Sequence, residues 1–333
     1  MQPALLEPKR RIIERQTPRG FGLELRRPER VILAFLIYAQ ILAFVLPVPL
    51  PVRCRLSLVH LSVTLTWGLL VYLDSRKPTL ITSVIRDWLP LGFVLLAYRE
   101  MGWFAMAHAG SALESHWVIW DHLVLRGGGK NAIEALGPIL PSVLEIAYTL
   151  VYALAPFSIV VLYFYGRRDL ADRFLFIFVL GVLLCYAQFP FWPSEPPRVV
   201  FFGQDFPAYD TVFRRFNWWL LGNYGIHTSV FPSAHVAGAF SAALGMRMVM
   251  PSHRWVSRFL GVMAALIAVA TVYGRYHYLA DAAAGFAMAG LAAAFEAYAT
   301  LMVFQRDRSL LHRKPPADAS CRPQGLLLNP RGE

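Results

Sequence analysis

Long apolar runs alternate with short polar stretches along most of the chain. The runs predict eight helices, at about residues 31–50, 56–73, 88–107, 140–165, 174–192, 231–250, 256–274 and 279–304. A helix needs roughly 20 apolar residues to cross the hydrocarbon core of a bilayer. Long unbroken apolar runs exclude a β-barrel, whose strands are short and alternate between apolar and polar residues. The pattern therefore predicts an all-α integral membrane bundle with about eight transmembrane helices.

Both ends of the chain are polar. Residues 1–30 carry eight Lys or Arg residues and lead directly into the first apolar run. A cleaved signal peptide would have a shorter apolar region and a small-residue cleavage site, so we expect a cytoplasmic basic arm. Residues 305–333 are polar and contain prolines, which predicts a disordered cytoplasmic tail. The transmembrane domain is expected to cover residues 31–304.

Composition and charge agree with a membrane protein. Hydrophobic residues make up 56% of the chain and charged residues 16%, whereas soluble domains carry about 25% charged residues. A net charge of +11 could indicate a nucleic-acid partner, but 23 of the 32 Lys and Arg residues fall in the loops on one side of the predicted topology. This bias places both termini in the cytoplasm and predicts no nucleic-acid binding. Cys54, Cys185 and Cys321 are far apart, so neither a disulfide framework nor a zinc site is predicted.

Three polar stretches meet the outer ends of the later apolar runs. The stretch FWPSEPPR follows the fifth run, FPSAH opens the sixth, and GRYHYLADAAAG opens the eighth. The prolines of the first stretch hold Arg198 in a stiff, extended segment. At the start of the sixth helix, the free N–H groups around Ser233 and Ala234 form an anion site. All three stretches are expected at one membrane face.

Two histidines and an aspartate belong to the same stretches. His277 and Asp281 are four residues apart and share one face of a helix, so the carboxylate can hold one imidazole nitrogen and leave the other free to attack. His235 lies at the start of the sixth helix, and Arg275 lies two residues before His277. Phosphoryl transfer needs cations for the phosphate oxygens, a nucleophile, and an acid for the leaving oxygen. The residues of these three stretches therefore predict phosphoryl transfer.

The ordered set of PPR, PSAH and RYHYLAD resembles the type 2 phosphatidic acid phosphatase superfamily over roughly residues 185–290. That family has the motifs K-x6-R-P, P-S-G-H and S-R-x5-H-x3-D. The resemblance implies a six-helix phosphatase-type core within a catalytic region at about 140–300. It implies that His277 becomes phosphorylated, that Asp281 orients it, and that His235 protonates the leaving group.

Phosphate binding is expected from four residues. The resemblance assigns Arg198 and Ser233 to this role, and Ala234 and Arg275 are further candidates. Since two arginines and a helix N-terminus already supply positive charge, no metal ion or other cofactor is expected.

The sequence departs from the family motifs at three positions. Phe191 stands where the first motif has its lysine, Ala234 replaces the glycine of the second, and Thr271 occupies the place of the third-motif arginine. This form is similar to the inositol phosphorylceramide synthase-like branch, whose members are inositolphosphotransferases.

The resemblance implies a lipid phosphatase that acts on a lipid phosphate or diphosphate at the outer membrane face. A phosphotransferase with an alcohol acceptor is the alternative. A transporter is less favoured, because transporters place charged sites near the midplane, and an inactive scaffold is less favoured because His235, His277 and Asp281 are intact. The expected partners are a membrane lipid phosphate and the bilayer. The expected location is a bacterial inner membrane, with the active site facing the periplasm or exterior.

The remaining ionisable residues allow simpler interpretations. Glu145 and Glu296 fall inside predicted helices; for Glu145, bundle packing is favoured over contact with a lipid head group. Arg214 and Arg215 are expected to meet lipid head groups. A metal site could be imagined from the outer-loop residues His108, Glu114, His116, Asp121 and His122. The spacings of the histidines fit no helical face, so a structural loop is expected there.

Overall fold

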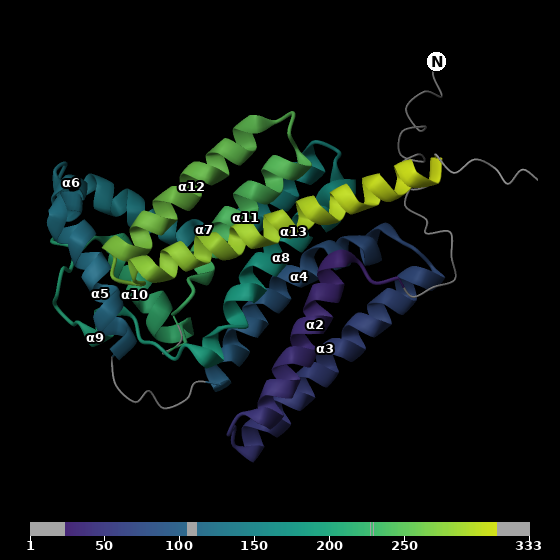
Figure 1. Cartoon of the computed structure of the whole chain (residues 1–333), viewed down its shortest axis with the longest axis horizontal. Helices are drawn as coiled ribbons and strands as arrows, with labels where there is room; N and C mark the ends of the chain where they lie inside the picture. Colours follow the sequence, from purple (N-terminus) through teal and green to yellow (C-terminus); the bar gives the residue numbers. More distant parts are fainter. Residues whose placement is uncertain (1–23, 105–111, 227, 229, 312–333) are drawn as a thin grey trace, which may run out of the picture. The chain divides into compact units, whose positions relative to one another are not determined.

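The computed structural model describes residues 24–104, 112–226, 228 and 230–311. Its long helices are α2 (Arg27–Val45), α3 (Leu50–Arg76), α4 (Leu80–Met101), α7 (Ile139–Phe164), α8 (Ala171–Tyr186), α11 (Ala234–Val249), α12 (Arg254–Tyr273) and α13 (Leu279–Leu311). Each predicted apolar run therefore forms a helix, and no strand occurs in the described ranges (Figure 1). The predicted all-α membrane bundle is confirmed.

One helix is shorter than the sequence pattern predicts. In the described part of the chain, seven helices are long and apolar enough to cross a membrane, which makes the chain an integral membrane protein. The predicted sixth span, 231–250, forms α11, which has 16 residues and is not one of the seven. Pro251 follows directly and stops the helix from extending. Most side chains of α11 are buried against α8 and α12, so this helix belongs to the interior of the bundle.

The centre of the bundle depends on close helix contact. Gly181 of α8 faces α11, and a Cβ atom at this position would lie 2.1 Å from the Ser241 hydroxyl oxygen. Only glycine permits this approach without a shift of the chain. By contrast, α3 exposes a row of leucines, including Leu58, Leu61, Leu65 and Leu69. Such a row is a liability in water, but lipid chains solvate it.

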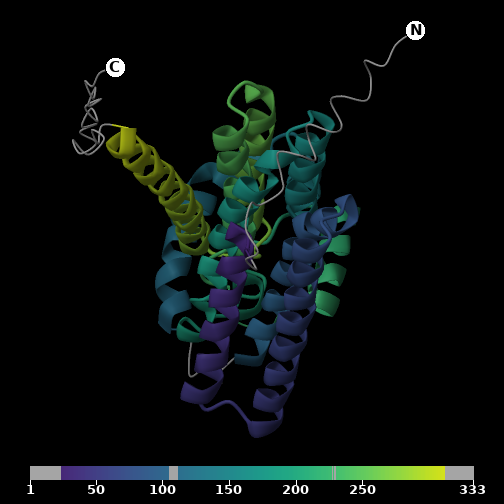
Figure 2. The same ribbon diagram turned by 90° about the vertical axis from the view of Figure 1, so that its right-hand side faces the viewer.

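The helices α2, α3 and α4 pack side by side (Figure 2). Near the start of α4, a group of buried and half-buried charged side chains ties α2, α3 and α4 to the segment before α8. We call it the α4 ion cluster; it consists of Arg26, Glu29, Asp74, Arg86, Asp87 and Arg168. Arg86 lies 2.6 Å from both Glu29 and Asp74. Asp87 lies 2.6 Å from Arg26 and 2.7 Å from Arg168.

Shorter helices connect the long ones. They are η1 (Gly102–Phe104), α5 (Ala112–Val124), η2 (Leu125–Gly129), α6 (Lys130–Glu134), η3 (Arg168–Leu170), η4 (Phe189–Phe191), α9 (Pro197–Val200) and α10 (Val212–Tyr224). The expected outer loop at 108–139 is therefore largely helical from Ala112 onward. In Figure 1, α5, α9 and α10 lie at the same end of the bundle.

The two ends of the chain differ from the expected boundaries. The first helix begins at Arg27 instead of residue 31, and the basic arm up to residue 23 lies outside the described residues. The chain divides into two compact units at Ala293, and the second unit contains the last part of α13. Within it, the Thr300 hydroxyl donates to the Glu296 carbonyl at 2.9 Å. The helix continues to Leu311, past the expected start of the tail, and residues 312–333 lie outside the described residues.

Candidate active site

Backbone hydrogen bonds bring the three polar stretches together. The Arg198 N–H donates to the Arg275 carbonyl at 3.2 Å, which ties the first stretch to the third. The Ser233 N–H donates to the Asp281 carbonyl at 3.0 Å, which ties the second to the third. Gly285 permits the second contact, because a Cβ atom there would lie 2.3 Å from the Ser233 carbonyl oxygen. Segments that are distant in the sequence thus form one site.

The two histidines and Asp281 form a connected row. His277 Nδ1 lies 3.3 Å from Asp281 Oδ2, which also accepts the Tyr278 N–H at 2.9 Å. His277 Nε2 lies 3.4 Å from His235 Nδ1. We assign the Nδ1 proton of His277 to the bond with Asp281, because a carboxylate can only accept. His277 Nε2 then carries the lone pair that a nucleophile needs.

Burial keeps His277 neutral. Its side chain is 9% exposed. This burial and the positive charge of Arg198 lower the pKa of His277 to about 3. Around neutral pH the imidazole is therefore unprotonated, which suits a nucleophile.

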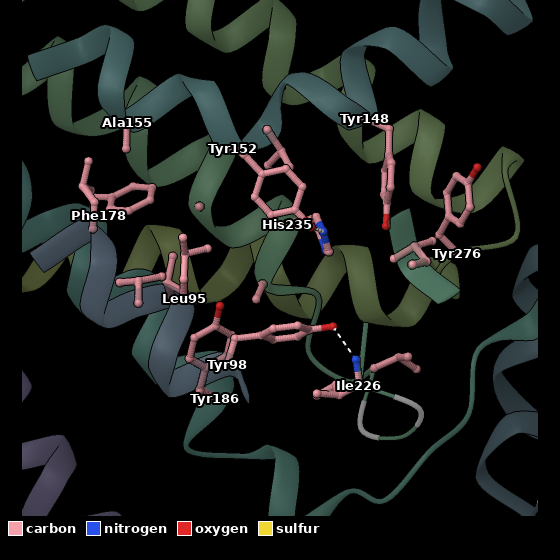
Figure 3. Close-up of a pocket in the computed structure, with 18 of the residues that line it drawn as sticks. Leu95, Tyr98, Tyr148, Tyr152, Ala155, Phe178, Tyr186, Ile226, His235 and Tyr276 are labelled. Atoms are coloured by element: carbon pink, nitrogen blue, oxygen red, sulfur yellow. Dashed lines mark hydrogen bonds between the residues drawn. The ribbon is translucent and has the colours of Figure 1, made fainter. Parts of the chain in front are cut away.

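Two tyrosines of α7 fix the ring of His235. Tyr148 stacks on it with a centroid distance of 5.0 Å, and the Tyr152 hydroxyl lies 3.3 Å from His235 Nε2 (Figure 3). Neither tyrosine is predicted as a site residue from the sequence. Their spacing of four residues places them on one helical face, but nothing local indicates that this face meets a histidine.

Arg198 is a cation whose charge acts on both histidines. Its Nη1 lies 3.4 Å from the Tyr276 carbonyl oxygen, and its guanidinium lies 5.7 Å from the centre of the Tyr276 ring. Among the described residues, no carboxylate forms an ion pair with Arg198. Burial lowers the pKa of Arg198, although a guanidinium stays charged in proteins. A half-buried cation without a carboxylate partner is suited to bind an anion.

The N-terminus of α11 contributes Ala234 and Ser233 in different ways. Ala234 is the first residue of α11 and lines the cavity beside His235. Ser233 is fully buried, and its hydroxyl accepts the Val236 N–H at 3.4 Å as the helix cap. Ser233 does not line the cavity. Its phosphate contact stays a prediction.

Arg275 is placed differently from Arg198. It is fully buried, adopts the left-handed backbone conformation with φ of 61°, and pairs with Asp121 at 2.6 Å. Its Nε and Nη2 atoms have no hydrogen-bond partner within the described part of the chain. Arg275 does not line the cavity. In this structure its guanidinium holds α5, and phosphate binding by Arg275 also stays a prediction.

The helix α5 carries two buried carboxylates that hold the site loops. Glu114 Oε1 accepts the Glu195 N–H at 3.1 Å, in the stretch that leads to Arg198. Asp121 Oδ1 accepts the Leu279 N–H at 2.8 Å, at the start of α13. The two carboxylates are seven residues apart, which puts them two turns apart on one helical face. In the sequence, this seven-residue spacing is the feature that could have indicated their shared role.

The histidines near α5 make other contacts. His116 Nδ1 lies 2.7 Å from the Ala112 carbonyl oxygen, and His122 Nε2 lies 3.1 Å from Asp205. His108 lies outside the described residues. Within the described ranges, no group of three or more His, Cys, Asp or Glu side chains could hold a metal ion.

Glu145 supports the site from α7. It accepts hydrogen bonds from the Tyr276 hydroxyl at 2.7 Å and from the Asn217 amide at 2.8 Å, and it pairs with Arg214 at 3.2 Å. Glu145 therefore packs within the bundle, as favoured. The expectation that Arg214 meets head groups is wrong, because its side chain is 6% exposed; that of Arg215 is 65% exposed.

The three positions that depart from the family motifs are not equivalent. Phe191 is exposed, where the motif has a lysine. Thr271 is fully buried, and its carbonyl accepts the N–H groups of Tyr276 and His277 at 2.9 and 3.0 Å. Thr271 therefore shapes the turn that presents His277 through its backbone.

A cavity of about 410 Å³ opens at the histidines. Four of the predicted site residues line it: Arg198, Ala234, His235 and His277. Asp281 lies behind His277. The structure thus places His277, His235 and Arg198 at one surface.

Comparisons with known proteins indicate a phosphatase-type superfamily. Over 51 residues the chain is 43% identical to a PA-phosphatase related-family protein of Dictyostelium discoideum, a stretch that covers 15% of this chain and 9% of that relative. The match therefore spans less than a tenth of the relative's length. No solved structure matches the chain. Residues 131–295, which contain Arg198, His235, His277 and Asp281, match the PAP2 superfamily.

Proposed function

We propose that the protein is a membrane-embedded lipid phosphatase that works through a phosphohistidine at His277. The observation that carries the proposal is the pair of imidazoles at 3.4 Å, beside an arginine without a carboxylate partner in the described structure, at the mouth of a largely apolar cavity. The match to a phosphatase-type superfamily supports it.

In the first half-reaction, His277 Nε2 attacks phosphorus and the bond between phosphorus and the lipid oxygen breaks. Protonated His235 gives its proton to that oxygen, and the lipid alcohol leaves. Arg198 and the N–H groups at the start of α11 stabilise the charge on the phosphate oxygens. In the second half-reaction, water attacks phosphorus, the bond to nitrogen breaks, and His235 takes up the proton. The products are phosphate and neutral His277.

The histidine pair must open for this reaction. An attacking atom needs about 3–3.5 Å to the reacting phosphorus, and the leaving oxygen lies beyond. A separation of 3.4 Å between the two nitrogens cannot hold a phosphoryl group. We infer that the phosphate enters between the rings and moves His235 away. The negative charge of the bound phosphate then favours proton uptake by His235.

The orientation and setting are part of the same proposal. The excess of Lys and Arg in the opposite loops supports cytoplasmic termini and a site at the outer face of the membrane. We propose a bacterial inner membrane as the setting.

The departures at Phe191 and Thr271 favour a second outcome, transfer to an alcohol as in the inositolphosphotransferase branch. Both outcomes share the first half-reaction and differ in what resolves the phosphohistidine. Supplying a lipid phosphate and measuring free phosphate while titrating alcohols separates them. Release of phosphate without any alcohol supports hydrolysis. Donor loss that waits for the alcohol supports transfer.

The central test uses a radiolabelled lipid phosphate in mixed micelles. A quenched reaction should trap an acid-labile phosphoenzyme, and His277→Ala should abolish it together with turnover. His253→Ala is the matched control, because His253 lies at the opposite ends of the helices, before α12. Turnover that survives in folded His277→Ala protein overturns the mechanism.

A further inference from the structure

The cavity continues from the histidines into the bundle between α4, α7 and α8. On α4 it is lined from Tyr98 through Leu95 and Gly92 to Trp88. These residues repeat at intervals of three and four, so they lie on one face of the helix. Ten residues separate the first from the last, which corresponds to about 15 Å along the helix axis. The cavity is therefore deep compared with a phosphate group.

The helices α7 and α8 also line the cavity, along the same direction as α4. On α7 the lining runs from Tyr148, next to His235, to Pro156. On α8 and the turn after it, the lining runs from Phe189 back to Phe178. Each stripe covers roughly two to three helical turns, about 12–16 Å. The cavity thus follows the helix axes from the site toward the interior.

Polarity changes along this path. Near the histidines the walls carry tyrosine hydroxyls, among them Tyr98, which accepts the Ile226 N–H at 3.0 Å. Farther along the walls are formed by Leu95, Ala155 and Phe178, which group together away from Tyr276 (Figure 3). One end therefore suits a phosphate and the other end suits hydrocarbon.

We propose that this part of the cavity binds a single hydrocarbon chain, the one next to the scissile phosphate, and that Gly92 sets how far the chain can enter. The phosphate at the other end rests on the proposed function. The substrate class is accordingly a phosphate ester of a long-chain alcohol, with its chain held along the helix axes. The wall formed by α4 lies outside the segment that matches the PAP2 superfamily.

Gly92 is suited to this role because it leaves space. A Cβ atom at Gly92 would meet no heavy atom within 4 Å, although the residue lines the cavity. A larger side chain can therefore project into the cavity without distorting α4. Gly261 of α12 is a matched control, because a Cβ atom there also meets open space and Gly261 does not line the cavity.

The first experiment measures kcat/KM for the water-soluble series ethyl, butyl, hexyl and octyl phosphate. In the wild type, kcat/KM should rise by up to about fourfold per added methylene, the effect of burying that group. In Gly92→Leu the rise should stop at a shorter chain, whereas Gly261→Leu should follow the wild type. If kcat/KM for phosphate release is independent of chain length in all three proteins, the chain site is overturned, whereas the proposed phosphatase activity is still supported.

The second experiment does not depend on turnover. A thiol introduced by Gly92→Cys in the His277→Ala protein is labelled with a maleimide, against the same protein without Gly92→Cys as background. Decyl phosphate should slow its labelling severalfold, while inorganic phosphate and ethyl phosphate should not, and Gly261→Cys should be unaffected. If decyl phosphate slows the labelling but the wild type hydrolyses none of the esters, the proposed phosphatase activity is overturned and the chain site is supported. Equal labelling with and without decyl phosphate overturns the chain site.

Discussion

Charged side chains gather near both ends of α4, and the two groups differ in how their charges are balanced. In the α4 ion cluster three arginines face three carboxylates at 2.6 to 2.7 Å. At the other end, Arg198 has no carboxylate partner within the described residues, and the histidine contacts are 3.3 and 3.4 Å long.

The difference separates charges that hold helices together from charges of the proposed site. A cluster in which every charge is paired needs nothing more, so it holds helices together. A half-buried cation without a counter-ion contributes little to folding and is stabilised by an anionic ligand. Buried charge alone is therefore a poor indicator of a site; incomplete pairing is the better one.

Substitution of one arginine in each group by methionine should give the largest effects. Arg86→Met should lower the free energy of unfolding by about 3–5 kcal/mol, because it leaves buried carboxylates unpaired. Arg198→Met should leave that free energy nearly unchanged and lower kcat/KM by about 10²–10³-fold. Thermal unfolding and phosphate release measure the two effects. Equal destabilisation by both substitutions would contradict the comparison.

Asp121→Asn tests a paired charge that also holds a loop of the candidate site. The substitution keeps an acceptor for the Leu279 N–H but removes the charge opposite Arg275. It should therefore lower the free energy of unfolding by about 1.5–3 kcal/mol, as for other hydrogen bonds to charged groups. Chemical denaturation in detergent measures it. Asp169→Asn, which breaks an exposed pair with Arg167, is the control and should lower the free energy of unfolding by less.

The lowered pKa of His277 predicts how stability depends on pH. Between about pH 6.5 and 3 the unfolded chain binds a proton at this residue and the folded protein does not, so the free energy of unfolding falls as the pH falls through this window. The slope from this one group is at most about 1.4 kcal/mol per pH unit. Denaturation of wild type and His277→Gln at several pH values should show a flatter dependence in the variant; parallel curves would argue against a neutral, buried His277.

Tyr152→Phe should give the smallest effect. It removes one hydrogen bond to His235, about 0.5–1.5 kcal/mol, so kcat should fall roughly two- to tenfold with the protein folded. Tyr165→Phe, which alters a tyrosine that does not line the cavity, should leave kcat unchanged. An equal loss in both variants would contradict a specific role of the contact with His235.

The sequence predicted the features that depend on residues close together in the chain. The apolar runs indicated the helices, and the four-residue spacing of His277 and Asp281 indicated their shared face. The burial of α11 inside the bundle could not be predicted, because its side chains continue the apolar pattern of its neighbours. The burial of Arg214 depends on Glu145, which is 69 residues away. Likewise, Asp121 acquires its role only through Arg275, 154 residues later.

The position of α5 bears on how this protein could be divided. Glu114 and Asp121 precede residue 131, where the match to the PAP2 superfamily begins, and so does the α4 wall of the cavity. A fragment cut at that boundary would keep both histidines and lose the carboxylates that position their loops. The smallest autonomous unit of this protein is therefore larger than its recognisable homology, and minimal versions should begin no later than α4.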